Sequence, residues 1–494
     1  MAELASHYEK IRNLYPQDRL LILFDIDGTI LDMRYMIHYV LTSYDLEHGT
    51  DFFKKLKISK IKVHENQVAT LLKRLELPED NRKEILEWYN QFYWSSESLL
   101  ESHRPFSGVL EVVRWFQLQP NTFVGLNTGR PESLREITLR SLNQLGKEYK
   151  VQFTQELLHM NPSGWEEKIE EAKVAGVRSF RQKGYRVFAF IDNEPANLES
   201  VSKIDPDHEI LFLHADTIFL SKRTRLPSNT VKGREYDLTE LIPEKALPQH
   251  IQFVWHGIND GTNLLRFLSS DIAWGECDVQ MDPIRNELIL HHDSLSETSF
   301  DLYEEWNTLD QLLSCMYQTG KSIKIDLKNG GILVDKVLES VEAHAFEDYR
   351  LWFNGKVEKL QERGFRKLYK AYPHAIIQCP VGFLAPLICS APEKAKEILD
   401  MFTSWGINRF SINWQAENMR TFLDQMDQWG YEVNVYNVPD LVSFLQAALL
   451  LPRSITSDFN FPKWQYYGRG SEKNGRLLKR SHGTSKRRRK INQQ

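Results

Sequence analysis

The sequence predicts an α/β protein of two domains, the first built on a parallel sheet and the second a TIM-like barrel. Its 494 residues exceed the length of one ordinary domain. Short apolar runs alternate with stretches of helical spacing, a pattern typical of parallel sheets covered by helices. Polar residues follow several of these runs, at the sheet edge where ligands bind in such folds.

The first half contains three strand-like runs and one long helical segment. Residues 20–31 (LLILFDIDGTIL) predict a buried strand that enters a turn at Asp27-Gly28. Residues 33–103 show helical spacing and no convincing strand, so they predict a helical insertion. A helix and two further strands are expected after it, at residues 108–116, 123–126 and 187–191.

The second half begins near Gln249, after a polar stretch that Pro243 and Pro248 punctuate. Helical stretches separate many of its strand-like runs, and alternation over this length predicts a TIM-like barrel at 250–466. The strand-like runs are 251–256, 274–279, 287–292, 322–327, 350–353, 374–378, 410–412 and 432–436.

The composition excludes several classes of protein. The 4 cysteines form no C-x-x-C pair, which argues against a disulfide scaffold and a cysteine-built zinc site. The N-terminus has no secretory signal pattern. The apolar stretch 441–451 is about half the length of a membrane span. We therefore expect a soluble, cytoplasmic protein.

One group of polar residues follows the strands of the first half. Asp25 ends an apolar run and Asp27 lies two residues on, which suits a nucleophile and a general acid/base for phosphoryl transfer. Thr128 ends the second strand, and Pro131 suits the first turn of a helix, so a hydroxyl and helix N–H groups would bind phosphate. Asp192 ends the third strand and, with Asp25, would hold Mg²⁺.

A lysine near this group would neutralise the phosphate and the nucleophile. Lys173 precedes Asp192 by 19 residues, at the start of a helix that leads into the third strand. Lys168 is the alternative, 24 residues before Asp192. We expect Lys173 to take this role, although either lysine would by default be a solvated surface residue.

These motifs resemble the haloacid dehalogenase-like (HAD) superfamily over residues 20–31 and 105–200. The resemblance implies a Rossmann-like core at 1–31 and 104–245, with 32–103 as a helical cap that selects the substrate. It also implies Mg²⁺, an aspartyl-phosphate intermediate, and the backbone carbonyl of Asp27 as a metal ligand. One position departs from the pattern: many members have two acids where this chain has Asp192-Asn193-Glu194. If the second acid is needed, either the metal binds more weakly or Glu194 takes its place.

A second group of polar residues lies in the predicted barrel. Glu276 and Asp278 alternate on one strand and share a face, and Asp326 and Lys328 do so on another. Three carboxylates inside a barrel would repel one another unless a cation lay between them. Two imidazoles near that cation would serve as general base and general acid in phosphodiester cleavage. His256 is one, and His292 or His291 is the other; strand alternation favours His292.

This block resembles the phospholipase C-like phosphodiesterases, which include glycerophosphodiester phosphodiesterases, and the menorin family in particular. The likeness lies in W-H-x-x-N (255–259), E-x-D-V (276–279), I-K-x-D-x-K (323–328) and L-W-F-N (351–354). It implies that His256 and His292 are catalytic and that Glu276, Asp278 and Asp326 hold Mg²⁺ or Ca²⁺. Lys328 would then stabilise phosphate oxygens. The arginine that usually follows the first histidine is replaced by Gly257.

The tail, residues 467–494, is polar and basic and is expected to be disordered. From Arg469 onward it carries a net charge of +9, so the rest of the chain carries −14. The basic clusters at 479–480 and 486–490 resemble a bipartite nuclear localisation signal, which keeps a nuclear location open for a eukaryotic chain. The charge would also attract nucleic acid or an anionic surface.

The sequence thus predicts a metal-dependent phosphatase fused to a phosphodiesterase barrel, acting on small phosphorylated substrates. One hypothesis is that the barrel cleaves a diester and the first domain then removes the remaining phosphate. The alternative is a single-site phosphatase whose barrel only binds a ligand or serves as a scaffold.

Overall fold

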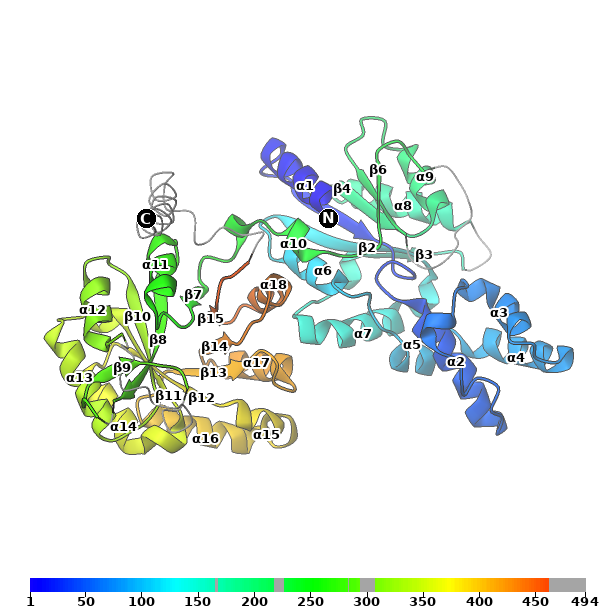
Figure 1. Cartoon of the computed structure of the whole chain (residues 1–494). Coiled ribbons are helices and arrows are strands. Elements are labelled where there is room, and N and C mark those ends of the chain that lie inside the picture. The colour runs from blue at the N-terminus through cyan, green and yellow to red at the C-terminus, as the bar shows by residue number, and fades with distance from the viewer. Residues whose placement is uncertain (165–167, 217–225, 283, 294–306, 462–494) are drawn as a thin grey trace, which may run out of the picture. The chain divides into compact units, whose positions relative to one another are not determined.

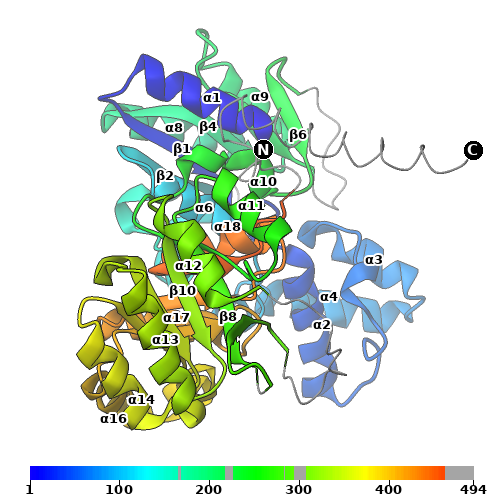
Figure 2. The same cartoon turned by 60° about the vertical axis from the view of Figure 1, so that its left-hand side comes forward.

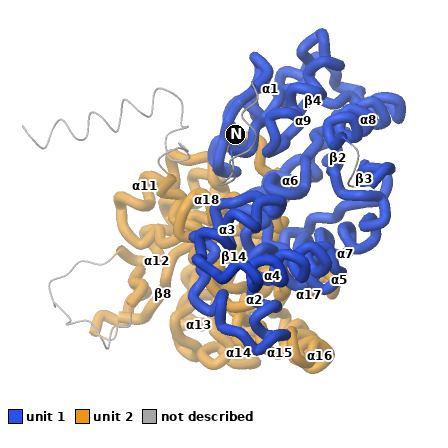
Figure 3. The backbone as a smooth tube through the Cα atoms, turned by 90° about the vertical axis from the view of Figure 1, so that its right-hand side faces the viewer, with its two compact units in different colours: residues 1–243 blue, residues 244–494 orange. Residues whose placement is uncertain are grey.

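The computed structural model describes residues 1–164, 168–216, 226–282, 284–293 and 307–461. The chain divides into two compact units, Met1–Pro243 and Glu244–Gln494 (Figure 3). Each unit has its own predominantly parallel sheet, so the predicted α/β class is confirmed. The predicted basic tail at 467–494 lies outside the described residues. Within the described ranges, no helix combines the length and the apolar character that a membrane crossing requires.

The first unit is built on a Rossmann-like sheet of six parallel strands in the order β3-β2-β1-β4-β5-β6 (Figure 1). The central strand β1 is buried from Leu20 to Phe24, which explains its unbroken apolar run. The strands are β1 (Arg19–Phe24), β2 (Thr122–Pro131), β3 (Leu158–Asn161), β4 (Tyr185–Asp192), β5 (Leu211–Ala215) and β6 (Thr230–Gly233).

Helices pack on this sheet and bury its apolar side chains. Leu21 and Leu23 of β1 form one core cluster with Val177, Phe180 and Phe190. The helices are α1 (Ala2–Leu14), α6 (Val109–Gln117), α7 (Arg135–Gly146), α8 (Ile169–Gln182), α9 (Pro195–Ser202) and α10 (Leu238–Leu241). The helix expected to begin near Pro131 begins instead at Arg135, because β2 extends to Pro131 and a 3₁₀ turn, Glu132–Leu134, comes first.

The segment between β1 and α6 is helical, as predicted, and contains no strand. Its helices α2, α3 and α4 lie side by side in both views (Figures 1 and 2). The Asp32 side chain caps the first of them, and Gly49 ends it in the left-handed conformation, with φ at 65°. The helices are α2 (Met33–His48), α3 (Val68–Arg74), α4 (Glu79–Phe92) and α5 (Ser96–Glu101), with 3₁₀ turns at Ile58–Lys60 and Glu65–Gln67.

The second unit contains a closed barrel of eight parallel strands, as predicted. The strands follow the order β10-β11-β12-β13-β14-β15-β7-β8, and the pairing of β10 with β8 closes the barrel. They are β7 (Gln252–Trp255), β8 (Trp274–Met281), β10 (Ser322–Leu327), β11 (Leu351–Gly355), β12 (Ile376–Pro380), β13 (Arg409–Asn413), β14 (Val433–Tyr436) and β15 (Ser454–Ser457).

One strand-like run of the sequence is not a barrel strand. Within residues 287–292 only β9 (Leu288–Leu290) is a strand, and it pairs antiparallel with β8. The eighth barrel strand is β15, whose four residues, SITS, include one large apolar side chain. The helices of the unit are α11 (Gly261–Ser269), α12 (Leu309–Tyr317), α13 (Ile332–Ala343), α14 (Val357–Ala371), α15 (Ala385–Ser390), α16 (Pro392–Ser404), α17 (Met419–Gln428) and α18 (Leu441–Leu449).

Candidate active sites

The first candidate site lies at the carboxyl ends of three neighbouring strands. Asp25 directly follows β1 and Asp192 ends β4, whereas Thr128, expected to end its strand, lies three residues before the end of β2. Because β1 pairs with β2 on one side and β4 on the other, these residues meet at one edge of the sheet. All three side chains are buried, so the site offers ionisable groups in surroundings that water barely reaches.

Lys173 of α8 joins two of these carboxylates. Its Nζ lies 2.5 Å from Oδ1 of Asp25 and 2.9 Å from Oδ2 of Asp192, and it donates to the carbonyl of Asn127 at 2.6 Å. Burial lowers the pKa of Lys173, but the two carboxylates outweigh it and the pKa is raised. Burial raises the pKa of Asp25 to about 7, although the Lys173 ammonium acts in the opposite direction.

The alternative lysine lies away from this group. Lys168 is exposed, and its Nζ is 3.3 Å from Oε1 of Glu171, one turn along the chain. The structure therefore brings Lys173, and not Lys168, to the strand ends.

Asn193 occupies the position where the related pattern often has a second acid. Its carboxamide faces Oδ2 of Asp25 and the backbone oxygen of Asp27, and with its nitrogen turned toward them it donates at 3.2 and 3.0 Å. In the other orientation three oxygens face one another, which suits a bound cation. Gly28 makes this approach possible: its φ is 77°, and a Cβ there would lie 2.5 Å from the Asn193 side chain.

Asp27 does not lie free at the edge of the site. Arg130 of β2 donates from Nε to its Oδ2 at 2.8 Å and from Nη2 to its Oδ1 at 2.6 Å. The Arg130 side chain is fully buried, whereas that of Asp27 is 17 % exposed. We did not predict this ion pair, although Arg130 shares a strand face with Thr128 by simple alternation.

The helical insertion brings an additional carboxylate toward Asp27. Glu65 lies in the 3₁₀ turn before α3, and burial followed by the charge of Asp27 raises its pKa to about 8. Nε2 of the neighbouring His64 lies 3.8 Å from Oε1 of Glu194. The insertion therefore lines the side of the site where Asp27 lies, and the sequence contained no motif that would reveal it.

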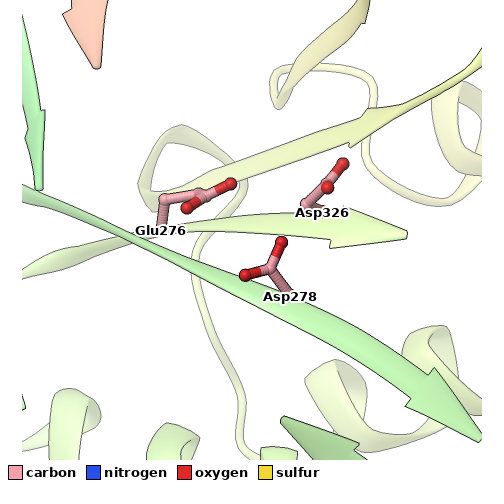
Figure 4. Close-up of side chains that lie close together, drawn as sticks. All are labelled: Glu276, Asp278 and Asp326. Atoms are coloured by element: carbon pink, nitrogen blue, oxygen red, sulfur yellow. The ribbon is translucent and has the colours of Figure 1, made fainter. Parts of the chain in front are cut away.

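The second candidate site is a group of three carboxylates inside the barrel (Figure 4). Asp278 of β8 pairs in register with Asp326 of β10, and Glu276 lies two residues before Asp278 on the same face. One oxygen from each carboxylate lies within 4.8 Å of the others, and all are carboxylate oxygens, the ligands that Mg²⁺ and Ca²⁺ prefer. The residues present therefore suit a hard divalent cation.

Lys328 lies between two of these acids. Its Nζ is 2.5 Å from Oδ1 of Asp278 and 2.5 Å from Oδ2 of Asp326. Burial raises the pKa of Glu276. Burial also acts to raise that of Asp278, but Lys328 and hydrogen bonds outweigh it, and the pKa is lowered. Two asparagines complete the group: Asn259 donates to Asp278 at 2.7 Å, and Asn354 donates to Asp326 at 2.6 Å.

The two predicted histidines lie near this group, with their rings edge to face at an interplanar angle of 79°. The rings of His256 and His292 have centroids 6.5 Å apart, and Nε2 of His256 lies 3.8 Å from Oε2 of Glu276. His291 instead directs its Nδ1 to the backbone oxygen of Asp293 at 2.9 Å.

Asp458, which we did not predict, follows β15 and holds Nδ1 of His256 at 2.7 Å. This hydrogen bond raises the pKa of His256 to about 9, although burial acts to lower it. Nothing near Asp458 in the sequence marks it as a histidine partner.

Comparison with known proteins finds similarity only at the level of solved structures. No protein-family model and no curated protein sequence matches the chain. Similar structures include a glycerophosphodiester phosphodiesterase from Agrobacterium tumefaciens str. C58, with 15 % identity over 42 % of this chain and 96 % of that one, at a TM-score of 0.31.

Two HAD hydrolases also occur among these structures. The one from Geobacter sulfurreducens PCA is 12 % identical over 44 % of this chain and 92 % of its own, at a TM-score of 0.27. The one from Deinococcus radiodurans R1 is 12 % identical over 41 % and 81 %, also at a TM-score of 0.27. Both classes of protein that the sequence resembles are thus found, each match covering less than half of this chain.

Proposed function

We propose that the unit Met1–Pro243 is a magnesium-dependent phosphomonoesterase with Asp25 as nucleophile and Asp27 as general acid/base. The observation that supports this most strongly is the buried Asp25 carboxylate beside the Lys173 ammonium at the end of β1, with Asp27 two residues on. Such a site holds a nucleophile, a proton carrier and a cation together in surroundings that exclude water.

The chemistry divides into two steps. An oxygen of Asp25 attacks phosphorus, the ester P–O bond breaks, and Asp27 gives its proton to the departing oxygen. Water then attacks the phosphorus of the aspartyl phosphate and Asp27 takes a proton from it. The bond between phosphorus and the Asp25 oxygen breaks, the Asp25 carboxylate is restored, and inorganic phosphate leaves. Lys173 balances negative charge in both steps, and the Thr128 hydroxyl would donate a hydrogen bond to a phosphate oxygen.

The oxygens around Asn193 suit Mg²⁺. Asp25, the backbone oxygen of Asp27, Asp192 and Oδ1 of Asn193 would hold the ion, and all are hard donors. When bound, Mg²⁺ would neutralise charge on the transferring phosphoryl group.

The test is hydrolysis of an aryl phosphate monoester by the full chain with Mg²⁺. Asp25→Asn should abolish hydrolysis, whereas the exposed control Asp207→Asn should not change it. Acid quenching of the wild type followed by borohydride reduction should convert Asp25 to homoserine. Full activity in Asp25→Asn, or hydrolysis with no modification of Asp25, would contradict the proposal.

We further propose that the barrel is a metal-dependent phosphodiesterase. Glu276, Asp278 and Asp326 would hold Mg²⁺ or Ca²⁺, and Lys328 would stabilise phosphate oxygens. One of the two histidines, His256 and His292, would act as general acid and the other as general base, with 6.5 Å between their ring centroids. The carboxylate group supports this role, because three acids so close together favour a cation between them.

The alternative is a barrel that only binds a phosphorylated ligand. His256→Ala and His292→Ala should each abolish hydrolysis of an aryl phosphate diester, while the exposed control His374→Ala should keep it. If no divalent cation supports diester hydrolysis by the wild type, the barrel is a binding module and the chain has one active site.

A further inference from the structure

The side chain of Arg130 is fully buried, which is unusual for an arginine, and its guanidinium contacts four other side chains. Its Nε donates to Oδ2 of Asp27 at 2.8 Å, and its Nη2 donates to Oδ1 of the same carboxylate at 2.6 Å. Its Nη1 donates to Oγ1 of Thr138 in α7 at 3.1 Å. Its Nη2 also lies 3.2 Å from Nε2 of the buried His103, and its guanidinium lies 5.2 Å from the ring centroid of Trp94.

This geometry fixes the direction of the Asp27 carboxylate. Two parallel hydrogen bonds from a planar guanidinium leave a carboxylate little freedom to rotate, which a single bond or a lysine would not achieve. The guanidinium is itself immobile because Thr138 holds it from the core and His103 from the end of the insertion. The position of Asp27 therefore depends on both parts of the unit.

A general acid contributes to the rate only while it stays within hydrogen-bond reach of the departing oxygen. Asp27 lies on the turn after β1, where nothing in the local backbone would hold its side chain in one direction. A misplaced catalytic group loses much of its effect even when the distance changes little.

We propose that Arg130 is a positioning residue that holds Asp27 in place for proton transfer and links that position to the insertion through His103 and Trp94. The inference rests on the proposed phosphomonoesterase function. If it is right, the loss of rate on substituting Arg130 should be larger for substrates whose leaving group needs a proton.

The test compares two monoesters with full-length protein: an aryl phosphate whose leaving group departs without a proton, and an alkyl phosphate whose leaving group needs one. General acid catalysis is worth roughly 100- to 10,000-fold, so Asp27→Asn should slow the alkyl substrate far more than the aryl one. Arg130→Gln should show the same preference, lowering kcat for the alkyl substrate about tenfold more than for the aryl one.

The effect of Arg130 should also vanish once Asp27 is removed. The double variant Arg130→Gln/Asp27→Asn should be no slower than Asp27→Asn alone, since a residue that acts through another gives non-additive losses. Arg130→Lys keeps the charge but not the planar fork. Like Arg130→Gln, it should therefore lower kcat more for the alkyl substrate than for the aryl one. The exposed control Arg140→Gln should match the wild type on both substrates.

Equal losses on the two substrates, or losses that multiply in the double variant, would overturn the inference. If circular dichroism shows that Arg130→Gln does not fold, Thr138→Val replaces it in the test, because it removes one hydrogen bond to the guanidinium. The same ratio of kcat on the alkyl and aryl substrates is then measured for that variant. Activity that persists in Asp25→Asn would instead overturn the proposed function. The two failures are therefore distinguishable.

Discussion

At the residue scale, Asn193 places a neutral side chain at the proposed Mg²⁺ site. Its amide lies against Oδ2 of Asp25 and the backbone oxygen of Asp27, where an acid would add a full negative charge. A neutral oxygen ligand binds a divalent cation less strongly than a carboxylate, because ligand charge is one of the quantities that set affinity. The site is therefore expected to need more Mg²⁺ than one with a second acid.

Substitutions at this position should change the Mg²⁺ concentration that gives half-maximal monoesterase activity. Asn193→Asp should lower it, and Asn193→Leu, which removes the oxygen, should raise it. Magnesium titrations of the two variants, with exposed Asn90→Leu as control, measure the shift. An unchanged requirement in Asn193→Leu would show that the amide is not a ligand.

The surroundings of His103 predict how the free energy of unfolding depends on pH. The ring is buried, its Nδ1 lies 2.6 Å from Oγ of Ser141, and Arg130 donates to its Nε2. Burial, followed by the charge of Arg130, holds the pKa of His103 well below its usual value. The unfolded chain therefore takes up a proton near pH 6.5 that the folded chain does not, and stability falls as the pH falls below that value.

His103→Gln keeps an acceptor for Arg130 but cannot titrate, so its stability should depend less on pH. The free energy of unfolding of the wild type should drop by up to about 1.4 kcal/mol more per pH unit below about 6.5. Urea unfolding of both proteins at about pH 7.5 and about pH 5.5 checks this. An identical loss in the two proteins would mean that His103 is protonated in the folded state.

At the scale of elements, the turn after β1 determines how closely the residues of the first site approach. Gly28 and Gly184 both have positive φ, 77° and 84°, but only at Gly28 would a Cβ meet a neighbour within 4 Å. Gly28→Ala and Gly184→Ala should each destabilise the protein by about 1–2 kcal/mol through the backbone. Only Gly28→Ala should also lower monoesterase activity, because it displaces Asn193. Equal activity in the two variants would contradict this.

Helix α8 contributes the Lys173 ammonium to the first site from its second turn. Lys173→Met leaves Asp25 and Asp192 buried together without their common partner, which should cost about 3–5 kcal/mol in the absence of divalent cations. It should also abolish monoesterase activity. The matched control is Lys168→Met, which removes an exposed lysine and should change neither quantity. Chemical unfolding and rate assays of both variants decide between the two lysines.

Much of this architecture could be predicted from local patterns. The strands β1 and β4 each combine an apolar run with an acid at or directly after the carboxyl end, so the positions of Asp25 and Asp192 followed from the sheet. Thr128 follows the apolar run of β2, but that strand continues to Pro131. The short strand β15 could not be predicted, because four residues of mixed polarity carry no period.

The supporting residues of the sites were harder to predict. Arg130 and Asp458 act on Asp27 and His256 from 103 and 202 residues away, and nothing in their local sequence names these partners. Glu65 lies in a helical insertion whose spacing predicts helices but not which of its side chains face the site. Such contacts depend on packing between distant segments, which periodicity does not report.

At the scale of the whole molecule, the chain carries two separate polar groups, one in each compact unit. Neither shares a described residue with the other, and each has its own carboxylates, its own lysine and its own proton carriers. If the barrel produces a monoester that the first unit then hydrolyses, each activity must still be separable by substitution. We therefore propose that two independent active sites in this chain act on phosphate esters.

The measurement that tests this claim most directly compares hydrolysis of an aryl phosphate monoester and an aryl phosphate diester by three proteins: the wild type, Asp25→Asn and His292→Ala. We predict that Asp25→Asn loses only monoester hydrolysis and that His292→Ala loses only diester hydrolysis. Loss of both activities in either variant, or diester hydrolysis that survives His292→Ala, would contradict it.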